Sequence, residues 1–90
     1  SPLPQRSETF SDNVDHFIHA ALDQAKATVF ADPRISSVNR NKEIIRLVHE
    51  QGIFKMKNAV PKVAQELGVS KNTVYLHLRS LKNADQGEEP

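Results

Sequence analysis

The chain has 90 residues, of which 38% are hydrophobic, and its formal net charge is +1. This length allows one small domain whose thin core holds three or four short helices and often relies on a partner. The absence of cysteine excludes disulfides and thiolate metal sites. Because neither an apolar run of membrane-spanning length nor a secretory signal is present, we expect a cytoplasmic protein with no membrane partner.

The small net charge hides an uneven distribution along the chain. Residues 1–38 sum to −2 and residues 83–90 to −3, whereas residues 39–82 carry nine Lys and Arg against three Glu, which gives +6. Such a basic segment is typical of a domain that binds a polyanion. The sequence therefore predicts a basic domain between two acidic flanks.

The N-terminal third predicts a linker followed by one amphipathic helix. Residues 1–10 hold two prolines and no hydrophobic period, so we expect a linker or chain end there. A helix is expected over residues 11–30, capped by Ser11 or Asp12. Its apolar side chains recur at helical spacing and are Val14, Phe17, Ile18, Ala21, Leu22 and Ala25.

A connection and a second helix come next. Proline biases the residue before it away from helix, so Asp32-Pro33 ends the first pattern and residues 31–38 form a connection. Asn39 is expected to cap a helix over residues 40–51, after which Gly52 suits a positive φ. Residues 53–57 alternate apolar side chains with lysines and could pass for a short strand. We interpret them as a tight linker that inserts Ile53, Phe54 or Met56 into the core.

The third and fourth helices form the most informative part of the sequence. Asn58 can cap a helix over residues 59–67, with Pro61 in its first turn, where the missing N–H has no intrahelical partner. Gly68 ends this helix, and Ser70 caps a fourth helix that runs to about residue 82. Two helices joined by so short a turn with glycine have the geometry of a helix-turn-helix. We therefore predict an all-α fold, a small helical bundle with a helix-turn-helix at residues 39–82, followed by a disordered acidic tail at 83–90.

A helical wheel assigns roles to the fourth helix. Val74, Leu78 and Leu81 define its buried side, which is expected to pack on Val63 and Leu67. Asn72 and Leu76 point outward, and Lys71 lies in the first turn, whose residues are nearest the groove floor when the helix enters N-terminus first. Lys71, Asn72 and Leu76 suit guanine, adenine and the thymine methyl group, respectively. We predict that they read base edges of double-stranded DNA. Contacts to the DNA backbone are expected from Ser70, Thr73, Tyr75, Arg79, Lys55 and Lys57.

Residues 42–78 resemble the C-terminal domain of the YheO-like family of bacterial PAS/helix-turn-helix regulators, of the DauR type. The similarity rests on Gly52-Ile53-Phe54, Lys57-Asn58-Ala59-Val60, Val63-Ala64, Leu67-Gly68-Val69-Ser70 and Thr73-Val74-Tyr75. The family usually has glycine at the position of Asn58, and both residues tolerate positive φ. The resemblance implies a transcriptional repressor whose sensor domain, which binds a small-molecule effector, is absent from this chain.

Two other functions have weaker support in the sequence. His16, His19 and Asp23 share one helical face and could offer three zinc ligands, but a solvated polar face is the simpler interpretation. No catalytic or cofactor-binding motif is recognisable, so we expect neither an enzyme nor a cofactor. A helix-turn-helix that binds proteins and not DNA is the main alternative.

The first helix also predicts an oligomeric state. Its stripe offers more apolar surface than the small domain at 39–82 obviously needs, so we expect a homodimer through Phe17, Ile18 and Leu22. A two-fold dimer would place two recognition helices about 34 Å apart along the duplex. Packing of the stripe on a sensor domain, or on the monomer's own core, remains the alternative.

Overall fold

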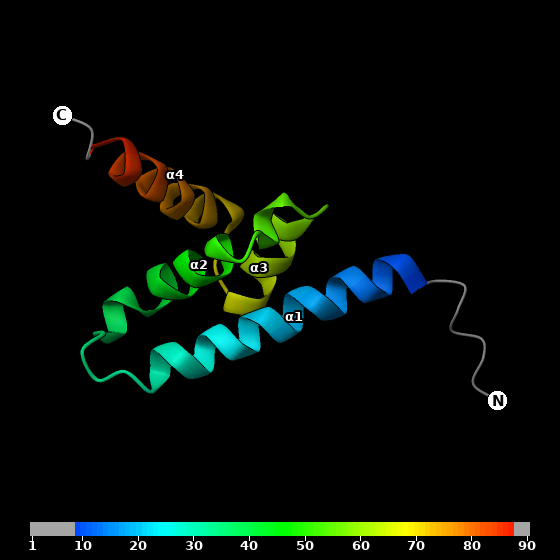
Figure 1. The fold of residues 1–90 in the computed structure, drawn as a ribbon, viewed down its shortest axis with the longest axis horizontal. Coiled ribbons are helices and arrows are strands. Elements are labelled where there is room, and N and C mark those ends of the chain that lie inside the picture. Colours follow the sequence, from blue (N-terminus) through cyan, green and yellow to red (C-terminus); the bar gives the residue numbers. More distant parts are fainter. Residues whose placement is uncertain (1–8, 88–90) are drawn as a thin grey trace.

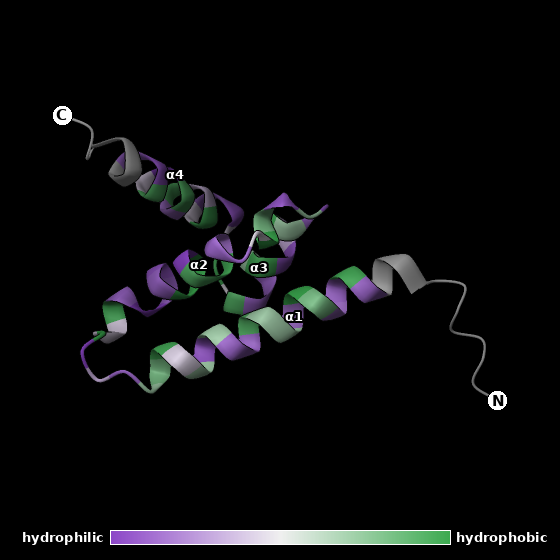
Figure 2. Ribbon diagram, in the orientation of Figure 1, coloured by the Kyte–Doolittle hydropathy of each residue, from purple (hydrophilic) through white to green (hydrophobic). Residues whose placement is uncertain are grey.

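The computed structural model describes the backbone of residues 9–87 and the side chains of residues 13–83. This part of the chain is all-α, as predicted (Figure 1), and its helices are α1 (Thr9–Phe30), α2 (Arg40–Glu50), α3 (Ala59–Leu67) and α4 (Lys71–Gly87). Two short 3-10 turns, η2 (Ser37–Asn39) and η3 (Ile53–Lys55), lie in the connections. Each helix mixes hydrophobic and hydrophilic residues (Figure 2), and within the described residues none is long and apolar enough to cross a bilayer.

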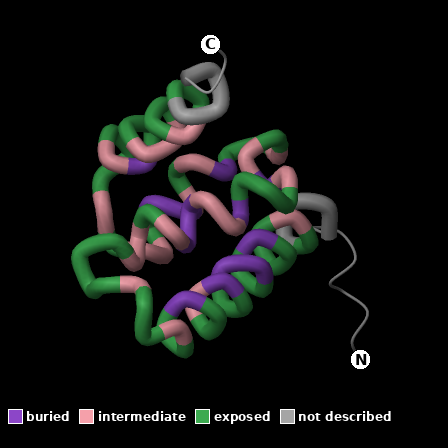
Figure 3. Tube along the Cα trace, turned by 60° about the vertical axis from the view of Figure 1, so that its left-hand side comes forward, coloured by how far each residue is buried: buried purple, intermediate pink, exposed green. Residues whose placement is uncertain are grey.

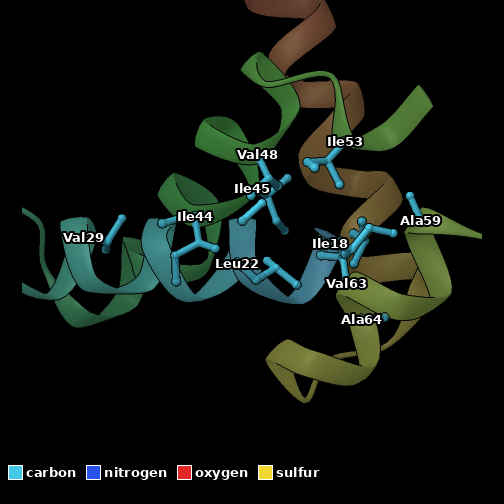
Figure 4. Packing of buried hydrophobic residues seen from close by; sticks show 13 residues of the cluster. Ile18, Leu22, Val29, Ile44, Ile45, Val48, Ile53, Ala59, Val63 and Ala64 are labelled. Atoms are coloured by element: carbon cyan, nitrogen blue, oxygen red, sulfur yellow. The ribbon is translucent and has the colours of Figure 1, made fainter. Parts of the chain in front are cut away.

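The helices enclose one core. Both α2 and α3 pack on α1, and α4 packs on α2 and α3 from the side away from α1 (Figure 1). The buried apolar side chains of this core, many of them drawn in Figure 4, are Ile18, Ala21, Leu22, Ala25, Val29, Ile44, Ile45, Val48, Ile53, Ala59, Val63, Ala64 and Val74.

The apolar stripe of α1 completes the core of its own chain. Ile18 and Leu22 are each 0% exposed and Val29 is 1% exposed, and Figure 3 shows buried turns recurring along this helix. Full burial of such side chains stabilises a fold by about 1.5–3 kcal/mol each. The helix-turn-helix is therefore not a self-sufficient unit at residues 39–82, because α1 supplies a large share of its core.

Helix α1 begins two residues earlier than predicted and ends where predicted. The helix begins at Thr9, so Ser11 and Asp12 lie inside its first turns instead of capping it. It ends at Phe30, where Asp32 accepts hydrogen bonds from the backbone N–H and the guanidinium of Arg34 at 2.9–3.0 Å. These bonds hold the pKa of Asp32 below its ordinary value. The Asp32-Pro33 break is thus where the sequence indicated it.

Three residues with positive φ join the helices. Gly52 has φ 82°, Asn58 has φ 60° and Gly68 has φ 71°, as the turn patterns predicted. The caps are less regular: Asn39 and Asn58 both occupy N-cap positions, yet neither makes a side-chain cap hydrogen bond. The amide of Asn39 donates instead to Ser36 Oγ at 3.3 Å. Asparagine therefore suits position 58 because it tolerates positive φ, and not because its side-chain amide caps α3.

The segment after Gly52 is a linker and not a strand. Residues 53–55 form the turn η3, in which Ile53 is fully buried. Phe54 and Met56 pack on the core while remaining partly exposed. The alternation of apolar residues and lysines therefore reflects one anchor in a short turn, as predicted.

The C-terminal helix is longer than predicted. α4 continues to Gly87, which corrects the expectation of a disordered tail for residues 83–87, while residues 88–90 lie outside the described part. The physical reason is local: between Lys82 and Gly87 the chain has neither proline nor glycine, so nothing interrupts helix propagation.

Candidate nucleic-acid interface

The helix α4 has one buried and one exposed face, as the wheel predicted. Val74 is fully buried, and Leu78 and Leu81 pack on the core. The opposite face is exposed and carries Asn72, Tyr75, Leu76 and Arg79, while Lys71 is exposed in the first turn. Leu76 is 61% exposed and Tyr75 55% exposed, so this face presents apolar as well as cationic groups. Several of the residues predicted to contact bases or phosphates are thus exposed on α4.

The turn before α4 fixes where this face begins. Val69 N–H bonds to Ala64 O at 3.0 Å and Gly68 N–H to Gln65 O at 3.3 Å, which closes α3 with a Schellman motif. Ser70 Oγ then accepts the N–H of Thr73 at 3.1 Å and lies 3.0 Å from Thr73 Oγ1. These contacts confirm the predicted cap, and they hold Lys71 and Asn72 in a rigid first turn.

The three glutamates of the basic segment, residues 39–82, contact side chains on α1 and α2. Arg46 binds Glu43 and Glu50 at 2.8 Å each, and the Glu43 contact raises the pKa of Arg46. Glu66 lies 3.0 Å from His19 on α1, and its backbone carbonyl accepts a hydrogen bond from Lys26 at 3.4 Å. Glu43 and Glu50 therefore pair with Arg46 on α2, and the carboxylate of Glu66 contacts His19 on α1.

Most of the other cations of residues 39–82 lie on and beside α4, although Lys42 on α2 is also exposed. Among the described residues, no carboxylate lies within ion-pairing distance of Lys55, Lys57, Lys71, Arg79 or Lys82. All five side chains are exposed. Much of the excess positive charge of residues 39–82 is thus exposed to solvent on α4 and on the turns that carry Lys55 and Lys57.

The predicted backbone-contacting lysines occupy different places. Lys55 lines a groove between α2, η3 and α4, together with Arg46, Phe54, Leu78, Leu81 and Lys82. Lys57 lies in the turn before α3. Lys82 was missed as a site residue, although its spacing of three residues from Arg79 placed it near the same face. The structure brings Lys82, and not Lys71, close to Lys55.

The histidine face of α1 has a structural use. His19 contacts Glu66 through Nδ1 at 3.0 Å and Asp23 through Nε2 at 3.3 Å, and Asp15 pairs with Lys62 on α3 at 3.5 Å. Of the side chains that the sequence allowed as zinc ligands, His19 therefore joins α1 to α3, and Asp23 contacts His19 on α1 itself. In the described part of the chain no group of three or more potential ligands is arranged to hold a metal ion.

The three predicted dimerisation residues are separated by the fold. Ile18 and Leu22 are fully buried against α2 and α3, so they have no surface left for a second chain. Phe17 is 49% exposed and points away from this core. Of the three, Phe17 alone can take part in contact between two chains.

A family model described as an HTH domain matches residues 15–79. The chain belongs to this helix-turn-helix family. The match begins within α1, which agrees with the packing of α1 into the core of the helix-turn-helix.

The relatives of this helix-turn-helix chain confirm the YheO-like resemblance. The uncharacterised protein YheO of Escherichia coli K12 is 36% identical over 84 residues, covering 92% of this chain and 35% of YheO. An uncharacterised Haemophilus influenzae protein is 30% identical over 80 residues, covering 89% of this chain and 36% of its own length.

A third relative has a described role. The transcriptional regulator DauR of Pseudomonas aeruginosa is 30% identical over 84 residues, covering 89% of this chain and 38% of DauR. The chain thus spans little more than a third of the length of these relatives. No solved structure gives a significant match.

Proposed function

We propose that this chain binds specific DNA sequences through α4, as the DNA-binding part of a bacterial transcription regulator. The observation that carries the proposal is the exposed side of α4, where Asn72 and Leu76 lie near Lys71 and Arg79, two cations with no carboxylate partner among the described residues. A recognition helix enters the major groove with its N-terminal residues nearest the bases. The rigid turn at Ser70 supports this orientation.

Specific reading is assigned to the start of α4. Lys71 can donate to guanine O6 and N7, Asn72 can bond adenine N6 and N7, and Leu76 can cover a thymine methyl group. All three are exposed, Asn72 and Leu76 on the face opposite Val74 and Lys71 in the first turn of α4. Each base contact of this kind discriminates by about 1–3 kcal/mol.

Contacts to the phosphates surround this reading face. Arg79 extends it along α4, and Tyr75 and Thr73 flank it, while Ser70 lies at the helix start. Lys55 and Lys57 project from neighbouring turns and would reach adjacent stretches of backbone. Such contacts position a protein on the duplex without reading its sequence.

The wider role rests on the relatives. DauR carries the name transcriptional regulator, and the chain covers little more than a third of its relatives. We therefore propose a cytoplasmic repressor that acts as a homodimer, with a small-molecule sensor in a part of the protein outside this chain. The alternative, a helix-turn-helix that binds another protein, is favoured by the apolar floor of the groove at Phe54, Leu78 and Leu81.

Two measurements on the 90-residue chain test the proposal. Selection from random duplexes is expected to enrich one sequence, and a palindrome would report two-fold binding. Affinity for unrelated duplex is expected to fall with salt, with a log–log slope of about −2.7 per chain if Lys55, Lys57 and Arg79 each neutralise one phosphate. A flat salt dependence together with no enriched sequence would favour the protein-binding alternative.

A further inference from the structure

The outer face of α1 carries an uncharged strip that no other element covers within the described part of the chain. Phe17, Ala20, Gln24 and Ala27 are exposed and follow one another at spacings of three and four residues. This is the spacing of a coiled-coil seam, and it lies about 130° around the helix from the buried stripe. Asn13 and Ala31 continue the strip at either end and are also exposed.

The charges of α1 lie elsewhere on the helix. Asp15 pairs with Lys62, and Lys26 donates to the carbonyl of Glu66, so both point toward α3. Asp23 is held by His19 at 3.3 Å. An exposed helix face normally carries charged side chains, whereas this strip combines a half-exposed phenylalanine with small or neutral residues.

The order of residues along the strip is self-complementary in one orientation. We propose that this strip pairs with the same strip of a second copy, with the two α1 helices antiparallel and the two-fold axis near Leu22. In that register Phe17 of one chain faces Ala27 of the other, and Ala20 faces Gln24. A large side chain then meets a small one in every layer, which gives nearly constant helix spacing. A parallel pair would stack Phe17 on Phe17 and leave thin alanine layers beside it.

The size of the strip indicates a moderate affinity. Residues 13–31 span about 28 Å of helix, and a pair of such helices buries on the order of 1,000 Å² in total, the lower limit for a specific interface. We therefore expect dissociation in the micromolar range. Since α4 lies on the other side of α2 from α1 (Figure 1), the pairing leaves the DNA-reading face uncovered.

This inference names the surface of the homodimer in the proposed function, and it can be tested without DNA. Sedimentation equilibrium of the chain is expected to show a monomer–dimer equilibrium, and Ala27→Glu to raise the dissociation constant about tenfold or more, because it buries an unpaired carboxylate. Val38→Glu is the matched control, since Val38 is 82% exposed outside the strip. A strict monomer at several hundred micromolar, or equal effects of both variants, would overturn the proposal.

The orientation has its own test, for which the absence of cysteine provides a clean background. Chains with Ala20→Cys and chains with Gln24→Cys are expected to form a disulfide when mixed, while neither cross-links to itself. In the antiparallel register, Ala20 is displaced by about four residues from Ala20 of the second copy, too far for a disulfide. Cross-linking of either variant to itself would contradict that register.

Binding to a single DNA half-site separates this inference from the proposed function. Ala27→Glu is expected to leave half-site affinity unchanged, because Ala27 is remote from α4. If the chain dimerises as described but shows no DNA binding, the proposed function fails and the dimer stands. If the chain binds DNA but stays monomeric, the DNA-binding function stands and the proposed dimer fails.

Discussion

At the scale of single residues, local chemistry assigned roles with good accuracy. Gly68 takes φ 71°, and Ser70 caps α4 through a 3.1 Å bond, because both depend only on neighbours within a few positions. Asn58 also has the positive φ that a position usually occupied by glycine in the family suggested. The roles of Lys71 and Asn72 in reading bases remain predictions, although both side chains are exposed at the start of α4.

We predict that Lys71→Ala and Asn72→Ala weaken specific binding more than non-specific binding. Each is expected to cost about 1–3 kcal/mol at one base position, because each removes one contact to a base edge. Fluorescence anisotropy with the selected site and with random duplex measures the difference. Lys42→Ala, which removes an exposed cation from α2, is the control. Equal losses on both duplexes would show that Lys71 and Asn72 contact phosphates.

We predict that Gly68→Val lowers the stability of the fold itself. No heavy atom lies within 4 Å of a Cβ built at Gly68, so the cost comes from positive φ and not from a clash. This strain is about 1–2 kcal/mol or more for a β-branched residue, which lowers the melting temperature of a small domain by roughly 4–8 °C per kcal/mol. Thermal unfolding followed by circular dichroism measures it, and Gly68→Asn, which tolerates positive φ, is expected to lose less. Equal melting temperatures for wild type and Gly68→Val would argue against this conformation.

At the scale of elements, α1 is the helix whose role the sequence left open. Its stripe could have served a second chain, a sensor domain or the monomer's own core. The structure shows the last of these for Ile18 and Leu22, and ionic contacts with Glu66 and Lys62 fix α1 on α3. Periodicity identifies an apolar face but not its partner, because the partner residues are distant in the sequence.

We predict that Leu22→Ala destabilises the monomer without a specific effect on association. Removing a fully buried leucine costs about 2–5 kcal/mol through lost burial and the cavity left behind. Urea unfolding measures the loss, and His16→Ala, an exposed change on the same helix outside the strip, is the stability control. If Leu22→Ala left the urea midpoint unchanged and reduced only self-association, the role of Leu22 in the core would be refuted.

At the scale of the whole molecule, two surfaces face away from each other. The helices α1 and α4 lie on opposite sides of α2 (Figure 1), so the proposed pairing of two chains and the proposed DNA binding would use different surfaces. The same core supports both helices, because α2 and α3 contact both α1 and α4.

We predict that dimerisation matters for palindromic DNA and not for half-sites. Binding of the wild-type chain to a palindrome is expected to be cooperative, because a chain bound to one half-site would bind the second chain through the α1 strip. Ala27→Glu is expected to remove this cooperativity, while Val38→Glu retains it. Titrations at fixed salt concentration measure both. A wild-type curve described by two independent sites would show that the dimer contributes nothing to DNA binding.

The sequence by itself determined the all-α class, the positions of the turns at Gly52, Asn58 and Gly68, and the buried side of α4. These features arise from interactions within one or two helical turns, so a local pattern is enough to predict them. Only the tertiary structure decided which face of α1 is covered and which cations keep their charge uncompensated. His19 and Glu66, for example, are 47 residues apart in the chain. Such pairings depend on how whole helices pack, and no local spacing encodes them.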